Sequence, residues 1–130
     1  MQLVAPRNQK LTNVLSLCVF TAMLAAGQVL FKHVGLSIRG LPPAGALFRI
    51  AADPLFYAAL ILYGAATLLW IWILSRVPLS QAYPWVSVGV FLVPLLGWWF
   101  FGERPGAIFW LGALVIICGV ILTQYGSQGG

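Results

Sequence analysis

Four long apolar runs constrain the fold of this chain more than any other feature. They lie at about 11–35, 55–74, 79–101 and 107–125. Each run is close to the ~20 residues that a helix needs to cross a ~30 Å hydrocarbon core. Strands do not fit, because an open sheet edge is unsatisfied in lipid and because the runs lack the alternation of barrel strands. We therefore predict an all-α membrane protein with four transmembrane helices in a single domain, residues 1–130.

The composition agrees with a membrane protein and excludes a water-soluble domain. Hydrophobic residues make up 62% of the chain and charged residues only 7%, whereas soluble domains carry about 25% charged residues. The formal net charge is +5, but the basic residues are scattered singly between the apolar runs and form no stripe. Lys and Arg that flank membrane spans explain this distribution, so we expect no nucleic-acid partner.

The connections between the runs contain the breaks that helix ends require. Prolines occur in the short turns at 75–80 and 102–105. The long connection at 36–54 contains a Pro-Pro pair and then a segment that predicts a short helix at the membrane interface, with Arg49 at the level of the headgroups. An alternative for the N-terminus is a cleaved signal peptide, but the apolar run is long and continues past its small residues.

Basic residues give this chain almost no preferred orientation. With four spans, the N-terminus, the second loop and the C-terminus share one side, which carries Arg7, Lys10 and Arg76. The cations expected on the other side are Arg39, Arg49 and Arg104. Such a weak positive-inside bias has two explanations. Either a partner or the first helix sets the orientation, or the chain inserts both ways and pairs antiparallel, as inverted repeats do in many transporters.

The sequence contains no set of residues typical of an enzyme or a metal site. Asp53 and Glu103 are the only acidic residues and lie at the edges of spans, and His33 is the only histidine. We interpret Cys18 and Cys118, which lie inside apolar runs, as buried free cysteines that act as small hydrophobes. We expect no catalytic residues, no bound metal and no cofactor.

Two polar side chains near the end of the first run are the leading candidates for a binding site. Gln28 and Lys32 are four residues apart, so a helix places them on one face. Thr21 and Ala25 extend that face. One interpretation is that Lys32 only snorkels, with its ammonium at the interface. The other is that the cation faces a cavity and meets an anionic group, which Gln28 favours because an amide at this depth needs a partner or water.

The third run begins with a second group of polar and aromatic side chains. Tyr83, Trp85 and Ser87 cluster there and form either an aromatic belt at the interface or part of a binding site. Pro84 and Pro94 lie in the same run, and we expect Pro94 to kink the helix because it lies well inside the span. Kinked helices with small residues often line cavities that move.

Two glycines leave one face of the fourth run without side chains at two positions. Gly112 and Gly119 lie seven residues apart, and small residues at such spacing let helix backbones approach closely. We interpret this face as a packing seam, either within the subunit or, as we favour, at a dimer interface. The tryptophans that flank the third loop are interpreted as interface anchors, and they are Trp98, Trp99 and Trp110.

Four segments in this order resemble the drug/metabolite transporter superfamily. They are GQVLFK late in the first run, VPLSQAYPWVSVG at the start of the third, GERP after it and GALVIICGVIL in the fourth. The small multidrug resistance branch keeps a membrane glutamate eight residues before a lysine, and this position is Leu24 here. The tryptophan of its third span would fall on Val86, with Trp85 one position away. The resemblance implies a small-multidrug-resistance-like fold that works as a dimer, but without the carboxylate that binds cations and exchanges protons.

A second, EamA-like branch, the lipid-linked sugar flippase subunits, is more similar. That branch has a GQ pair followed by a lysine, an AYP start to the third span and an acid–proline turn. The matching residues here are Gly27-Gln28, Lys32, Ala82-Tyr83-Pro84, Glu103 and Pro105. One departure is that Arg104 separates the acid from the proline. The resemblance implies translocation of an undecaprenyl-phosphate-linked monosaccharide, such as 4-amino-4-deoxy-L-arabinose, across the bacterial inner membrane.

The substrate that this resemblance implies suggests roles for the candidate residues. The cations expected to attract the phosphate are Lys32, Arg39 and Arg49. The side chains expected to hydrogen-bond the sugar are Gln28, Tyr83 and Ser87. Glu103 has two interpretations: it pairs with an amino group on the sugar or, as we favour, with Arg104 or a helix end.

A four-helix monomer of this size encloses a thin cavity at best, so we expect a second subunit. The pair is either a homodimer, which can be antiparallel, or a heterodimer with a paralogue, surrounded by membrane lipids. Two other functions stay open. A proton-coupled exporter of small cations or metabolites needs a buried carboxylate, which the sequence does not supply. A non-transporting subunit of a membrane glycosyltransferase system would copurify with that enzyme and transport nothing alone.

Overall fold

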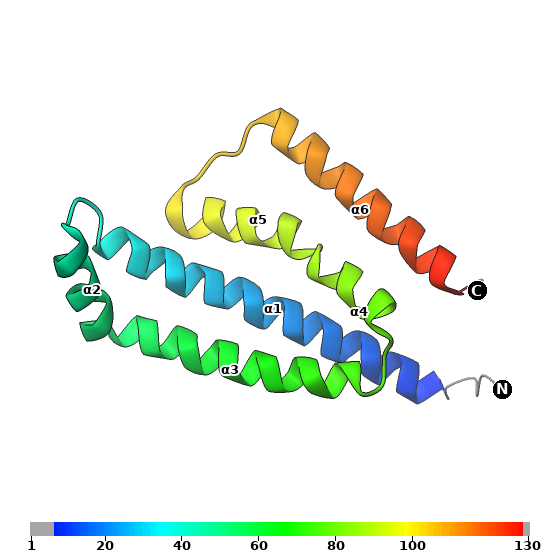
Figure 1. Ribbon diagram of the computed structural model, residues 1–130. Helices are drawn as coiled ribbons and strands as arrows, with labels where there is room; N and C mark the ends of the chain where they lie inside the picture. Colours follow the sequence, from blue (N-terminus) through cyan, green and yellow to red (C-terminus); the bar gives the residue numbers. More distant parts are fainter. Residues whose placement is uncertain (1–6, 129–130) are drawn as a thin grey trace.

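The computed structural model describes residues 7–128 as helices and their connections (Figure 1). The helices are α1 (Arg7–Ser37), α2 (Pro43–Ala52), α3 (Pro54–Leu74), α4 (Leu79–Val86), α5 (Gly89–Phe101) and α6 (Ala107–Gln128). Four segments are long and apolar enough to cross a membrane, namely α1, α3, α6 and the combined α4 and α5. The structure confirms an all-helical, multi-pass membrane protein, and residues 7–128 contain no strand.

Helices α1 and α3 form the closely packed half of the molecule. They lie side by side along most of their length, and α2 joins them at one end (Figure 1). Ala59 and Ala66 of α3 are fully buried, and such small side chains let two helix backbones approach closely. Toward the other end, Phe20 of α1 stacks on Trp70 of α3 with the ring centroids 4.6 Å apart. Packing on α3 therefore holds α1 in place.

The third span is interrupted between α4 and α5. The backbone N–H of Val88 donates to the carbonyl of Trp85, three residues back instead of four, at 3.1 Å. The same carbonyl also accepts a hydrogen bond from Thr21 Oγ1 of α1 at 3.4 Å. Ser87 and Gly89 flank the break, and helices kink readily at Gly and Ser. The interruption is therefore tied to α1 through a side-chain hydrogen bond.

The break in the third span does not lie at Pro94, and the kink expected at this proline stays a prediction. The helix continues through Pro94, which lies inside α5, and breaks at Ser87–Val88 instead. A proline in a membrane helix removes one backbone donor, and local adjustment of the neighbouring hydrogen bonds compensates for it.

The connection between the first two spans contains a short helix, α2. Leu47 and Phe48 on this helix are 70% and 78% exposed, beside an exposed Arg49. Asp53 then ends α2 and caps α3, because its Oδ1 accepts a hydrogen bond from a backbone N–H of α3 at 2.9 Å. Exposed apolar side chains next to a cation are typical of a helix at a membrane surface. The interfacial position of α2 stays a prediction.

Helix α6 stands apart from α1 and α3 (Figure 1). It packs mainly on α4, where Gln124 Nε2 donates to the carbonyl of Gln81 at 2.9 Å. At its first turn, Trp110 contacts Phe91 of α5 edge to face, with centroids 5.2 Å apart. A mainly apolar groove of about 390 Å³ separates α6 from the α4–α5 junction. The fourth span is thus held by few contacts within the described chain.

The glycine face of α6 contacts no other part of the described chain. A Cβ atom at Gly112 or at Gly119 would find no neighbouring atom of residues 7–128 within 4 Å. The structure therefore does not show a packing seam within the subunit. A dimer interface stays the prediction for these two glycines.

The two cysteines are free, but their interpretation as buried residues is wrong. Cys18 and Cys118 both lie on the outer surface of the described chain. The physical reason is that lipid tails are as apolar as a protein core. An apolar run in a membrane span therefore does not show which of its side chains face protein and which face lipid.

Candidate functional site

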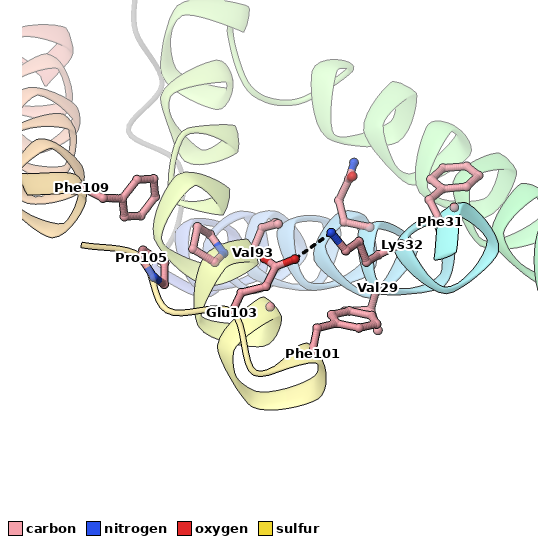
Figure 2. Close-up of a pocket in the computed structure, with 12 residues that line it drawn as sticks. Val29, Phe31, Lys32, Val93, Phe101, Glu103, Pro105 and Phe109 are labelled. Atoms are coloured by element: carbon pink, nitrogen blue, oxygen red, sulfur yellow. Dashed lines mark ion pairs between the residues drawn. The ribbon is translucent and has the colours of Figure 1, made fainter. Parts of the chain in front are cut away.

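One pocket brings the end of the first span together with the end of the third. Its volume is about 510 Å³, and it lies between α1, α5 and the turn that leads to α6 (Figure 2). Its walls are mainly apolar and include Phe31 and Phe101. Among the described residues, the polar side chains that line it are Gln28, Lys32 and Glu103. A few polar groups in an otherwise apolar hollow are typical of a ligand site.

The two charged residues of the pocket form an ion pair. Lys32 Nζ lies 2.7 Å from Glu103 Oε1, and the side chains are 43% and 46% exposed (Figure 2). The partner favoured above for Glu103, Arg104 or a helix end, is therefore not the one found. Within residues 7–128, Arg39, Arg49 and Arg104 make no ion pair. Lys32 therefore lines a cavity and pairs there with a carboxylate of the chain itself. Its role as a ligand-binding cation stays a prediction.

A left-handed turn directs Glu103 back toward the pocket. Gly102 ends α5 with a φ of 66°, which side chains disfavour, and its N–H donates to the carbonyl of Trp98 at 3.1 Å. The next N–H, that of Glu103, donates to the carbonyl of Gly97 at 3.2 Å. A Cβ at Gly97 would lie 2.7 Å from Glu103 Oε2, so the missing side chain makes room for the carboxylate. Two glycines therefore set the position of this acid.

Gln28 is held by Tyr63, a residue that the sequence analysis does not select. Gln28 Nε2 donates to Tyr63 Oη of α3 at 2.6 Å. The Tyr63 ring lies against Gly27, where any Cβ would overlap it, and packs on Phe31 with centroids 5.1 Å apart. The sequence does contain a signal that Tyr63 makes a polar contact, because a phenol inside an apolar span needs a hydrogen-bond partner. Tyr63 thereby fixes the amide at the wall of the pocket.

Tyr63→Phe is expected to lower the free energy of unfolding by about 1 kcal/mol, because it removes the oxygen that accepts from Gln28 but keeps the ring. Unfolding in mixed lipid–detergent micelles measures the change. Tyr125→Phe is the matched control, since that side chain is 74% exposed on α6. Equal stability of the two variants would show that the hydrogen bond contributes nothing.

Comparison with known proteins places the chain in a family. The EamA-like transporter family matches residues 7–125, nearly the whole chain. The chain belongs to this family. Membership in the EamA-like transporter family confirms the resemblance carried by the GQVLFK, AYP and GERP segments.

Several relatives of this EamA-like protein carry the name probable 4-amino-4-deoxy-L-arabinose-phosphoundecaprenol flippase subunit ArnE. The protein of that name from Pectobacterium atrosepticum is 37% identical over 107 residues, which cover 82% of this chain and 90% of the relative. The one from Aeromonas salmonicida is 34% identical over 110 residues, covering 85% and 95%. The one from Serratia proteamaculans is 35% identical over 112 residues, covering 83% and 92%. No solved structure gives a significant match.

The structure of this EamA-like protein distributes the predicted site residues over two places. Gln28, Lys32 and Glu103 meet in the pocket, and the end of the bundle that holds the pocket also carries the exposed cations Arg39 and Arg49 (Figure 1). Arg39 and Arg49 do not line the pocket themselves. The other predicted residues outside it are Tyr83, Trp85 and Ser87. They belong to the α4 half of the third span, which lies toward the chain termini (Figure 1).

The residues of the α4 half have separate surroundings. Tyr83 is 62% exposed on the outer surface, and Ser87 is half-buried at the helix break. Trp85 lines the groove beside α6, together with Gln124 and Tyr125. Within one subunit this group is therefore a separate feature from the pocket of Lys32. In the described part of the chain, no three His, Cys, Asp or Glu side chains gather into a possible metal site.

Proposed function

We propose that this chain is one subunit of a flippase that carries an undecaprenyl-phosphate-linked monosaccharide, such as aminoarabinose, across the bacterial inner membrane. The observation that carries the proposal is the meeting of Lys32 and Gln28 in a mainly apolar pocket. The names of the relatives support the same substrate class. In this proposal the chain transports its ligand and does not transform it.

The substrate class needs a site for an anion, for hydroxyl groups and for the start of an apolar tail. Lys32 supplies the cation for the phosphate. Gln28, held in place by Tyr63, supplies an amide for the sugar hydroxyls. The aromatic walls, Phe31 and Phe101, suit the first isoprene units of the tail. An ionisable residue within a span is tolerated when it faces a cavity and has a partner, and Lys32 meets both conditions.

A cation exporter of the small multidrug resistance type has less support. Leu24 occupies the position of the membrane glutamate and packs against the hydrophobic cluster of α1, α3 and α4. The carboxylate of the pocket, Glu103, is already paired with Lys32. A cationic drug would therefore have to compete with the protein's own ammonium for that carboxylate.

A second subunit completes the transport path in this proposal. The Lys32–Glu103 pair is only partly enclosed, and α6 leaves much of its apolar surface open. The pocket is lined by residues near the end of α1 and at the end of α5. Helix α4 lies toward the other end of the bundle (Figure 1). In an antiparallel dimer, the segment from Tyr83 to Ser87 of one subunit would therefore lie on the same side of the membrane as the pocket of the other. A heterodimer with a paralogue in the opposite orientation would have the same geometry.

Reconstitution into proteoliposomes tests the proposal. The full chain, alone and with a four-span paralogue from the same genome, is mixed with undecaprenyl-phosphate-linked aminoarabinose, and external periodate oxidises the sugar diol as it reaches the outer leaflet. We expect protein-dependent transfer between leaflets. No transfer in either preparation, together with copurification of a membrane glycosyltransferase, would instead support a non-transporting subunit and contradict the proposal.

A further inference from the structure

The pocket holds one cation and one anion that already neutralise each other. Lys32 Nζ lies 2.7 Å from Glu103 Oε1, and Figure 2 shows the two side chains pointing toward one another from α1 and from the turn after α5. Both remain partly exposed, so a ligand can reach them. Apart from Gln28, the surrounding side chains in the described chain are apolar. An unpaired charge in such surroundings is unfavourable.

Glu103 has little freedom to withdraw from the pocket when it loses its partner. Its backbone N–H is bonded to the carbonyl of Gly97, and Gly102 holds the preceding turn in the left-handed conformation. Its second carboxylate oxygen rests against Gly97. The charge of Glu103 therefore stays in or beside the pocket while a ligand is bound to Lys32.

A head group that offers only a phosphate disturbs this balance. The phosphate forms an ion pair with the ammonium of Lys32. The carboxylate of Glu103 then has no cation as a partner and lies next to the negatively charged phosphate. A head group with both a phosphate and a primary amine restores both pairings. Its phosphate binds Lys32 and its ammonium binds Glu103, so one ion pair is exchanged for two without a change in net charge.

We propose that Glu103 is a specificity-determining residue that selects head groups carrying an amine beside the phosphate over those carrying the phosphate alone. The inference rests on the proposed function and deepens it, because it assigns the choice of substrate to one side chain. An aminosugar on polyprenyl phosphate and an ethanolamine phospholipid share this chemistry. The experiment therefore has to separate these two sources of the amine.

The test compares two undecaprenyl phosphate lipids that differ in one group, with 4-amino-4-deoxy-L-arabinose or L-arabinose as the sugar. The vesicles consist of phosphatidylglycerol and phosphatidylcholine, which contain no primary amine. We expect the wild-type protein to flip the aminosugar lipid about tenfold faster, as for other hydrogen bonds between charged groups. Glu103→Gln should remove this preference. Asp53→Asn, which removes the other carboxylate of the sequence but lies outside the pocket, should keep it.

Equal flipping of both lipids by the wild-type protein, or an undiminished preference in Glu103→Gln, overturns the inference and leaves the proposed function standing. Inhibition by added phosphatidylethanolamine that disappears in Glu103→Gln supports the inference and shows that the site accepts amine–phosphate head groups in general. Preference without such inhibition supports it with the sugar lipid as the source of the amine.

If neither lipid moves, the proposed function fails and the selectivity is decided by binding. Thermal stabilisation of the full chain in detergent is then measured with 4-amino-4-deoxy-L-arabinose 1-phosphate and with L-arabinose 1-phosphate. Stabilisation by the aminosugar phosphate alone, lost in Glu103→Gln, supports the inference. Equal stabilisation by the two compounds, or none by either, overturns it.

Discussion

Lys32→Gln is expected to lower the flipping rate of the sugar lipid by about 10- to 100-fold, because a hydrogen bond to a charged group contributes about 1.5–3 kcal/mol. Lys32 is the cation among the described residues that line the pocket, so the phosphate loses its partner. The same change leaves the carboxylate of Glu103 unpaired, which makes the pocket repel an anion. The measurement is the initial rate of transfer between leaflets in proteoliposomes.

Two further variants separate the charge of Lys32 from other effects of the substitution. Lys10→Gln makes the same change on an exposed turn near the other end of α1 and should leave the rate unchanged. With the L-arabinose lipid, which has no amine, Lys32→Gln combined with Glu103→Gln should bind the phosphate better than Lys32→Gln alone, because the repulsion by Glu103 is gone. The double variant should still flip this lipid more slowly than the wild type. An unchanged rate in Lys32→Gln would mean that this lysine only snorkels and that the pocket is not the substrate site.

Gly27→Ala is expected to lower the free energy of unfolding by about 1–3 kcal/mol, the usual range for overpacking. The added Cβ overlaps the ring of Tyr63, whose Cδ2 would lie only 2.8 Å away. The ring cannot turn aside easily, because Oη is bonded to Gln28 and one edge packs on Phe31. Helices α1 and α3 must therefore separate, which also loosens the wall of the pocket.

Gly35→Ala is the matched control for this effect. It makes the same substitution two turns further along α1, where a Cβ meets no atom of the described chain within 4 Å. Alanine favours a helix over glycine by about 1 kcal/mol, so this variant should be as stable as the wild type or more so. Unfolding in mixed micelles therefore gives changes of opposite sign for the two variants. A shared sign, or no recovery when Tyr63→Ala is added to Gly27→Ala, would contradict the proposed overlap.

The number of membrane spans and their helical structure could be predicted from the sequence because the bilayer fixes both. A span must be about 20 apolar residues long and must satisfy its own backbone, which leaves the helix as the solution. The interruption at Ser87–Val88 could not be predicted in the same way. The run at 79–101 is apolar enough overall to predict one unbroken span, although it contains Ser80, Gln81 and Ser87. The break is tied to Thr21 on another helix. Hydropathy along the chain contains no information about that contact.

The candidate site shows the same limit. Gln28 and Lys32 could be selected from the first run alone, since polar groups at that depth need partners. The pairing itself could not be predicted, because the packing of α3 brings Tyr63 to Gln28 and a left-handed turn brings Glu103 to Lys32. For Glu103 the neighbour in sequence, Arg104, suggests the wrong pairing, because the carboxylate pairs with Lys32 in the pocket and Arg104 does not line that pocket.

The small number of contacts that α6 makes with the rest of the chain affects the abundance of the protein in a cell. Helices α1 and α3 pack on each other, so the stability of this pair comes from contacts within one chain. Helix α6 has few contacts of its own, and whatever covers its open surface binds the folded form and stabilises it by mass action. The occupancy of the native arrangement of the fourth span then rises with the density of subunits in the bilayer. If the proposed dimer forms, a chain made without its partner would expose this helix first to membrane proteases, so the abundance of one subunit would follow that of the other.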